Sequence, residues 1–308
     1  MSAADVVGLA RAEGLADVAE DLAGCVRPGW RIVPSGERAP SGVSKVGGSP
    51  DLADGESWPL SARGIPMGFV AQIDCRAIPP LPVEWEEQVR AWRHGSQLVR
   101  LFINVLDNWE LGPACALACD PRLPLTRTTA PPIPDPWPAG GSWDSLHRQD
   151  RSRLYVLPET AVGFEPFLTA PETHPVLRRD LQQFDEGAER YLQWLYRLRI
   201  DGAPNDAKSF IKPWEVHHLL GEPISVQDDI RSLGAMLHQR ADEWAAERAV
   251  PADPALGDEA AWQVLLGLHM DDRLRLEIFD GGAIQILAPV ADLADGRLDR
   301  LVYGISSG

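Results

Sequence analysis

The sequence lacks the apolar stretches that would place the chain in a membrane. No run approaches the roughly 20 apolar residues that a membrane-spanning helix needs. With 44% hydrophobic and 24% charged residues, the composition is typical of a soluble globular protein. Residues 1–24 contain neither a basic segment nor an uninterrupted apolar core, so they do not resemble a secretion signal. We therefore expect a cytoplasmic protein that makes no membrane contact.

Cysteine is also scarce, and its spacing fits neither a zinc site nor a redox pair. The four cysteines are Cys25, Cys75, Cys115 and Cys119. Only the last two are close in sequence, four residues apart, and no second pair follows to complete a set of metal ligands. Without an export signal we expect these thiols to be reduced. The sequence predicts no cofactor and no metal.

Common catalytic signatures are missing as well. The chain contains no Gly-x-Ser-x-Gly elbow, no His-Glu-x-x-His pair and no glycine fingerprint of a dinucleotide-binding fold. Members of a catalytic triad need not be neighbours in sequence. The absence of motifs therefore weakens the case for an enzyme without removing it.

Basic residues, above all lysine, are also few. Lysine occurs only at Lys45, Lys208 and Lys212, and 45 acidic residues against 29 basic ones give a formal net charge of -16. Such a surface repels phosphate backbones, so we expect no nucleic-acid binding. The excess of negative charge would either attract a basic protein partner or only keep the protein soluble.

Hydrophobic periodicity predicts both helices and strands. Apolar residues at helical spacing predict helices over residues 3–23, 83–92, 175–199 and 226–248. Alternating or continuous apolar runs predict strands over residues 30–33, 68–74, 98–105, 154–157, 262–270, 273–279, 283–287 and 298–305. The Asp-Gly-Gly at residues 280–282 predicts a hairpin between the two strands beside it. Strands at both ends with helices between and beside them favour an α+β fold with mainly antiparallel sheets.

One main domain accounts for this pattern. We expect residues 1–28 to form an N-terminal helical extension and residues 29–308 to form the α+β domain. Residues 120–141 are rich in proline and are expected to form a surface excursion that holds neither a strand ladder nor a helix. The two strand-rich regions either derive from a duplicated unit or merely share the composition of ordinary core strands.

The most informative segment is the turn that contains Lys45, Gly47 and Gly48. Adjacent glycines free the backbone to direct several N–H groups toward one point, where Lys45 could add charge for an anion. The spacing is not that of a phosphate loop. A purely structural turn leading into the first sheet is the alternative.

Four more polar residues are candidates for ligand binding. Gln72 and Asp74 fall on one face of a predicted strand. There they either bind a ligand or form hydrogen bonds to partners inside the protein. His218 and Gln227 complete the set. His217 and His218 are adjacent on an extended segment and point to opposite sides, so they would not chelate one metal together.

Several segments resemble one family of bacterial proteins. They are residues 44–75 (SKVGGSPDLADGESWPLSARGIPMGFVAQIDC), which include Trp58-Pro59; residues 218–223 (HLLGEP) with Gln227; and a C-terminal block containing Asp-Gly-Gly. Together they are similar to the YwqG-like family, which is built around a domain of unknown function. The resemblance implies an α+β fold and a cytoplasmic bacterial protein, and it implies no activity.

The chain departs from that family pattern at two places. Residues 268–271 read Leu-His-Met-Asp where the family has Gln-Ile-Asp at the end of a strand. Residues 278–280 read Ile-Phe-Asp where the family has Trp-Gly-Asp. A polar role that those family residues play elsewhere does not carry over to this chain.

Two functional hypotheses follow. The first is a non-catalytic binding or protein-interaction module, such as an acidic inhibitor or immunity-type partner of a basic protein. It rests on the missing catalytic motifs, the acidic charge and the tryptophans in predicted loops, namely Trp58, Trp109, Trp137, Trp143 and Trp214. The second is an enzyme or sensor that acts on a small anionic or sugar-like ligand in a cleft between the strand-rich halves. Lys45, Gln72, Asp74 and His218 would line that cleft.

Overall fold

The computed structural model of the chain describes most of the sequence. The described residues are 1–86, 89, 97–107, 111–134, 151–171, 186–200, 216–224, 229–239, 251–272, 274–278 and 281–306.

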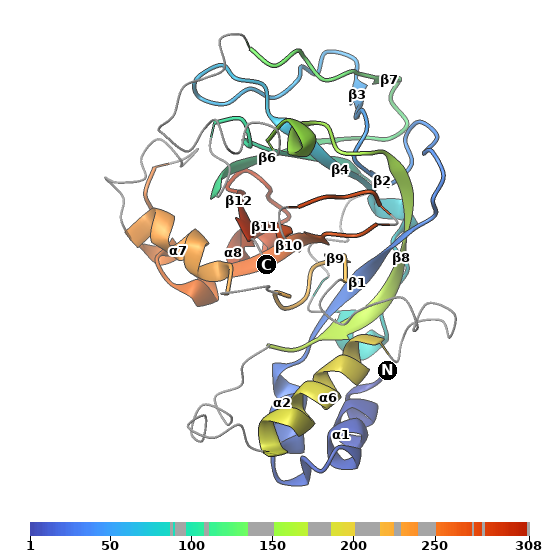
Figure 1. The fold of residues 1–308 in the computed structure, drawn as a ribbon, viewed down its shortest axis with the longest axis vertical. Coiled ribbons are helices and arrows are strands. Elements are labelled where there is room, and N and C mark those ends of the chain that lie inside the picture. Colours follow the sequence, from blue (N-terminus) through green and yellow to red (C-terminus); the bar gives the residue numbers. More distant parts are fainter. Residues whose placement is uncertain are drawn as a thin grey trace.

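Ten strands close into one barrel (Figure 1). They are β1 (Arg27–Pro34), β2 (Lys45–Val46), β4 (Gly68–Asp74), β5 (Leu98–Ile103), β6 (Leu111–Cys119), β8 (Thr160–Thr169), β9 (His218–Leu219), β10 (Trp262–His269), β11 (Ala283–Pro289) and β12 (Val302–Ser306). Their order around the barrel is β1-β8-β2-β4-β5-β6-β12-β11-β10-β9, and each pair of neighbouring strands is antiparallel. The predicted α+β class with mainly antiparallel sheets is confirmed, and both strand-rich regions contribute to the same barrel.

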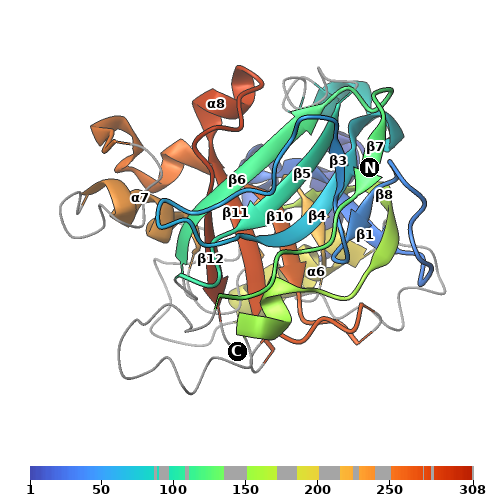
Figure 2. The same cartoon turned by 90° about the horizontal axis from the view of Figure 1, so that it is seen from above.

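A second, two-stranded sheet lies against the outside of the barrel. It pairs β3 (Asp51–Ala53) with β7 (Leu125–Arg127) and covers the part of the barrel formed by β4, β5 and β6 (Figures 1 and 2). The prediction that the proline-rich segment holds no ladder was wrong at β7. Residues 125–127 contain no proline, so three consecutive amide groups remain for a short ladder.

The helices pack around one end and one side of the barrel. Helices α1 (Ala3–Ala12), α2 (Ala19–Cys25) and α6 (Glu186–Ile200) gather at the end where β1 and β8 extend furthest, and α7 (Arg231–Gln239) lies beside β10 and β12 (Figure 1). A short helix, α8 (Val290–Ala294), follows β11. The helix expected over residues 3–23 is interrupted at Gly14, whose φ of 79° is outside the helical region. In the described residues no helix has the length and apolar character required to cross a bilayer.

The strand registers separate an apolar inner face from a partly polar outer face. One row of paired residues across β1, β9, β10, β11 and β12 is Trp30, Leu219, Leu266, Ile286 and Tyr303. All five are buried in the main core cluster, which also includes side chains of α1, α2 and α6. The adjacent row is Arg31, His218, Gly267, Gln285 and Gly304. Because side chains alternate along a strand, this row faces outward from the barrel.

Two predicted strands are absent from the described residues. Residues 151–155 form a helical turn where a strand was expected over residues 154–157, because a short apolar run fits either structure. In the described part of residues 273–279 the chain turns, and Asp271 bridges Leu276. The strands that flank this turn, β10 and β11, pair directly with each other. The division into residues 1–28 and 29–308 stays a prediction.

Candidate functional site

Lys45 and Gln72 meet in a buried polar cluster around Asp51. They are paired across β2 and β4, and both side chains are 0% exposed. The carboxylate of Asp51, at the start of β3, lies 3.3 Å from Lys45 Nζ and accepts a hydrogen bond from Gln72 Nε2 at 2.8 Å. Gln72 Oε1 in turn accepts from the Asp51 amide at 2.9 Å. The structure thus brings two predicted site residues together around a third that the sequence did not single out.

The second strand of the small sheet completes this cluster. Arg127 Nε donates to Asp51 Oδ1 at 3.1 Å, and its guanidinium also contacts Glu159 at 3.3 Å. Burial alone would raise the pKa of Asp51, but hydrogen bonds from Gln72 and the Gly42 amide, together with the charge of Lys45, hold it below its usual range. Burial lowers the pKa of Lys45, against the opposing charge of Asp51. The arrangement joins the small sheet to the barrel and presents no charged group to solvent from Lys45 or Asp51.

A neighbouring ion pair extends the same outer face. Arg100 lies beside Gln72 in the β4–β5 pairing, is fully buried and pairs with Glu56. Its guanidinium also donates to Cys119 Sγ at 2.6 Å. These contacts occupy both terminal nitrogens of the Arg100 guanidinium.

The two glycines direct their amides to backbone carbonyls. Gly47 N–H donates to Val70 O at 2.9 Å, and Gly48 N–H donates to Leu157 O at 2.8 Å. Both residues have positive φ, 64° and 75°. A Cβ on Gly47 would lie 2.2 Å from Pro158 O, so close packing of the chain requires glycine here. This geometry favours the structural turn over an anion-binding loop.

Asp74 belongs to a separate local arrangement. Its carboxylate accepts from the Arg76 amide at 3.1 Å and from the Arg76 guanidinium at 2.9 and 3.0 Å. It therefore caps a single turn of 3₁₀ helix over Cys75–Ala77. Asp74 does not join Lys45 and Gln72.

His218 lies in a second polar cluster, on the short strand β9. Its Nδ1 is 2.8 Å from Leu220 O, and because a carbonyl only accepts, Nδ1 carries the proton and Nε2 is an acceptor. His217 has the opposite tautomer, since its Nδ1 accepts from the His269 amide at 3.1 Å. His217 Nε2 therefore donates to Asp271 Oδ2 at 3.0 Å.

Three buried polar atoms in this cluster have no hydrogen-bond partner among the described residues, and two of them, His218 Nε2 and Gln285 Oε1, are acceptors. The third is His269 Nε2. The two imidazole rings are 6.4 Å apart between centroids, and a Cβ on Gly267 would lie 2.3 Å from His218 Nε2. Gly267 thus leaves the space that the His218 ring occupies.

Burial keeps both of these histidines neutral. It lowers the pKa of His218 to about 4 and lowers that of His269 well below its usual range. Within the described residues no group of three or more His, Cys, Asp or Glu side chains is arranged to hold a metal ion. Chemically, the cluster offers neutral acceptors to a hydrogen-bond donor. Gln227, the last of the predicted ligand-binding residues, lies outside the described residues.

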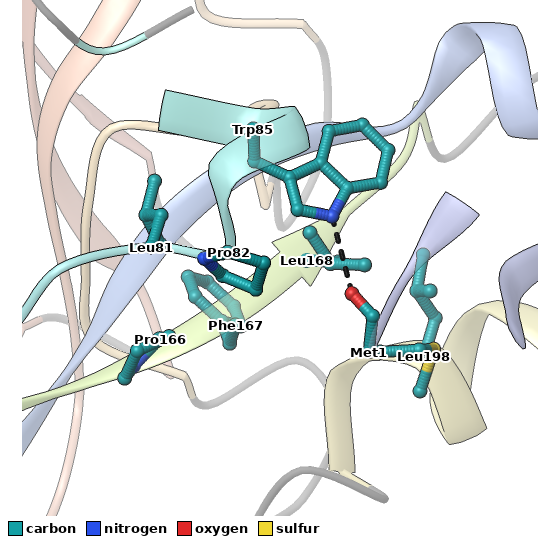
Figure 3. Close-up of a pocket in the computed structure, with 8 residues that line it drawn as sticks. All are labelled: Met1, Leu81, Pro82, Trp85, Pro166, Phe167, Leu168 and Leu198. Atoms are coloured by element: carbon teal, nitrogen blue, oxygen red, sulfur yellow. Dashed lines mark hydrogen bonds between the residues drawn. The ribbon is translucent and has the colours of Figure 1, made fainter. Parts of the chain in front are cut away.

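An apolar pocket opens at the end of the barrel near α6 (Figure 3). Its lining residues are Met1, Leu81, Pro82, Trp85, Pro166, Phe167, Leu168 and Leu198. The cavity volume is about 50 Å³. The Trp85 indole N–H donates to the main-chain oxygen of Met1 at 3.1 Å, which joins two walls of the pocket.

Acidic residues lie next to the lining residues in sequence. Glu84 is exposed and precedes Trp85, and Glu165 precedes Pro166 in β8. The guanidinium of Arg31 is buried, 5.7 Å from the centre of the Phe167 ring and 3.6 Å from Glu165. The described lining side chains carry no hydroxyl, thiol, imidazole or carboxyl group, so the pocket offers a mainly apolar surface that can hold an apolar group.

Two parts of these sites could not be predicted from the sequence. Asp51 and Arg127 are 76 residues apart, and no local pattern signals that their side chains meet. The pocket residues come from four separate segments. One sign was present, because Trp85 follows a proline-rich stretch and was expected on the buried side of a short helix. Of the loop tryptophans, Trp58 packs edge-on against Phe102 and donates to Met67 O, and the other four lie outside the described residues.

A comparison with protein families finds one similar segment. Residues 44–85 match a family described as a domain of unknown function, DUF1963. This segment contains Lys45, Gln72 and Asp74 and extends to Trp85 of the pocket. No curated protein matches the chain.

We expect Gly47→Ala to be strongly destabilising. The new methyl group would meet Pro158 O, and the residue would keep a positive φ, so the free energy of unfolding should fall by about 3 kcal/mol. Gly36→Ala is the matched control, because Gly36 has a φ of 76° with nothing within 4 Å of its Cβ position. That change should cost about 1 kcal/mol. Urea unfolding followed by tryptophan fluorescence measures both, and equal losses would contradict the packing argument.

We expect Lys45→Met to lower the free energy of unfolding by about 3 kcal/mol, because it removes the fully buried one of the two cations that pair with the Asp51 carboxylate. Arg11→Met removes an ion pair whose side chains are 59% and 75% exposed and serves as the control, with a loss of at most about 0.5 kcal/mol. Adding Asp51→Leu to Lys45→Met should cost less than the sum of the two single changes. A strictly additive result would show that the two side chains are not coupled.

The histidine cluster predicts a loss of stability in mild acid. A histidine whose pKa is lowered by folding contributes stability that is complete above about pH 6.5 and is lost as the pH falls toward the folded value. For His218 that window runs from about pH 6.5 to about 4. Unfolding free energies measured at steps of pH should therefore decline across it, and His218→Gln should flatten the decline. An unchanged slope in the variant would argue against a neutral, buried His218.

Proposed function

We propose that the chain is a non-catalytic binding module that recognises a basic protein, as an inhibitor or an immunity-type partner does. The observation that carries the proposal is the burial of the polar residues that a catalytic site would use. Lys45 and Gln72 are fully buried and bonded to Asp51, while Asp74 caps its own turn. These side chains lie in three separate surroundings, including that of His218, and do not line one cleft.

The charge of the chain supports a basic partner. The net charge is -16, and many carboxylates in the described part are exposed, as at Asp17, Asp54 and Glu84. Complementary charge speeds association and selects partners of opposite sign. The negative electrostatic potential of this surface would attract a basic protein, whereas it would repel a nucleic acid.

We also propose that the chain is a YwqG-like protein of the bacterial cytoplasm. The similarity of residues 44–85 to a domain of unknown function supports this assignment over one segment. The resemblance of the C-terminal block adds a second region of the chain. Cytoplasmic residence agrees with four cysteines that form no disulfide among the described residues.

A second candidate function is a sensor or enzyme for a small ligand at His218. It is favoured by the three buried polar atoms without partners, because an unsatisfied buried donor or acceptor costs about 1–3 kcal/mol. A ligand with hydroxyl or amide groups would satisfy them. A thermal-shift screen of sugars and small metabolites tests this function, since a ligand that binds the folded state raises its melting temperature. A shift that persists in His218→Gln would place the ligand elsewhere.

We expect the basic partner to be captured at low salt and released at high salt. The immobilised chain would be incubated with lysate of the organism that encodes it at about 20 mM and about 500 mM salt. The Debye screening length differs several-fold between these two salt concentrations. Mass spectrometry should then identify basic proteins enriched only at low salt. The control is a variant in which Asp17, Asp54 and Glu84 are changed to Asn and Gln. Absence of any enriched basic protein would contradict the proposal.

A further inference from the structure

We propose that the pocket between Trp85 and Phe167 is the point where the basic partner inserts one aliphatic side chain, flanked in the partner by lysine or arginine. This inference rests on the proposed function and adds the place and the chemistry of recognition. Its evidence is the size of the pocket, the apolar surface at its mouth and the charge beside it.

The size of the pocket fits a single side chain. Its volume is about 50 Å³, well below the roughly 300–1,000 Å³ of sites that enclose whole small molecules. Binding interfaces often depend on a few anchor side chains that fill such hollows. The walls are held in place, because Trp85, Phe167, Leu168 and Leu198 are themselves buried and Trp85 is bonded to Met1 (Figure 3). A preformed hollow binds an anchor with little loss of conformational entropy.

The mouth of the pocket exposes apolar groups to water. Val83, next to the lining residue Pro82, is 87% exposed, and Met1 is 40% exposed. Pro82 and Pro166 are also exposed. Large apolar side chains gathered at one place on a surface favour contact with another protein. Covering them would add apolar burial around the anchor.

The charge beside the pocket selects a basic segment. Glu84, whose carboxylate is exposed, precedes Trp85, and Glu165 is partly exposed beside Pro166. The carboxylate of Asp5 accepts hydrogen bonds from Ser2 and offsets the N-terminal ammonium of Met1. Arg31, whose guanidinium lies 5.7 Å from the centre of the Phe167 ring, is 3% exposed and faces Glu165. Its charge therefore reaches an incoming peptide only weakly. Lysine or arginine on both sides of the anchor would face carboxylates, and acidic flanks would be repelled.

Labelled peptides of one design test the proposal. Two of them carry two lysines or arginines on either side of a central residue, which is leucine in one and serine in the other. The third has leucine between glutamates. Fluorescence anisotropy with the full chain should show the basic leucine peptide binding about tenfold more tightly than the basic serine peptide, because only leucine gains from burial. The acidic peptide should not bind.

A matched pair of variants locates the contact. Pro82→Arg places a cation at the mouth and should weaken the basic leucine peptide by about tenfold and remove its advantage over serine. Pro124→Arg changes an exposed proline that directly precedes β7, which lies elsewhere on the molecule, and should leave that advantage intact. Both positions are exposed, so neither change disturbs the core.

The outcomes distinguish failure of the anchor site from failure of the proposed function. Equal affinities for the leucine and serine peptides, or equal effects of Pro82→Arg and Pro124→Arg, would overturn the anchor site while salt-sensitive capture of a basic protein still supported the function. No binding of the basic leucine peptide would also overturn the anchor site. Loss of the captured partner in Pro82→Arg, with retention in Pro124→Arg, would support both.

Discussion

The buried contact between Lys45, Asp51 and Gln72 determines how the first third of the chain folds. A charged side chain removed from water must be paired, because leaving it alone costs several kcal/mol. Lys45 is on β2, Gln72 on β4 and Asp51 on the separate small sheet, so satisfying the pair fixes three segments at once. Arg127 adds the second strand of that sheet. The polar residues that make this segment recognisable are thus accounted for by assembly of the fold.

The barrel explains why polar residues in strong strand patterns need not form a site. Its interior is filled by apolar side chains such as Trp30 and Leu266, and the alternating positions turn outward. Where the outside is covered, as by the small sheet over Gln72 and by the segment after His218, those outward residues are also buried. Their hydrogen bonds then serve the covering segments. What is left for recognition lies at the end of the barrel, where helices and loops meet.

Much of the architecture could be predicted from the sequence, and the failures have physical causes. The apolar run at β4 was located to the residue, and β10 and β11 were found from their continuous apolar character. β6 and β8 were missed, because Pro113 and Pro166 interrupt them and alanine and glycine dilute their pattern. Lys45 and Gln72 were predicted to lie near each other, but only as residues that line the same cleft. Their actual partner Asp51 depends on a sheet that forms between distant segments, and the distance of His218 from Lys45 depends on strand order.

Two of the ten strands are only two residues long, and they divide the barrel unequally. β2 and β9 each connect the ribbon of β1 and β8 to the sheet that runs from β4 to β10, and each contributes two pairs of residues on either side. Few ladder hydrogen bonds hold such seams, so local opening should begin there while the six-stranded sheet stays intact. The β1–β8 pair would then move as one unit relative to the six-stranded sheet, and the contacts of Lys45 on β2 and His218 on β9 would hold it closed. Amide exchange at Val46 and Leu219 would report how often it opens.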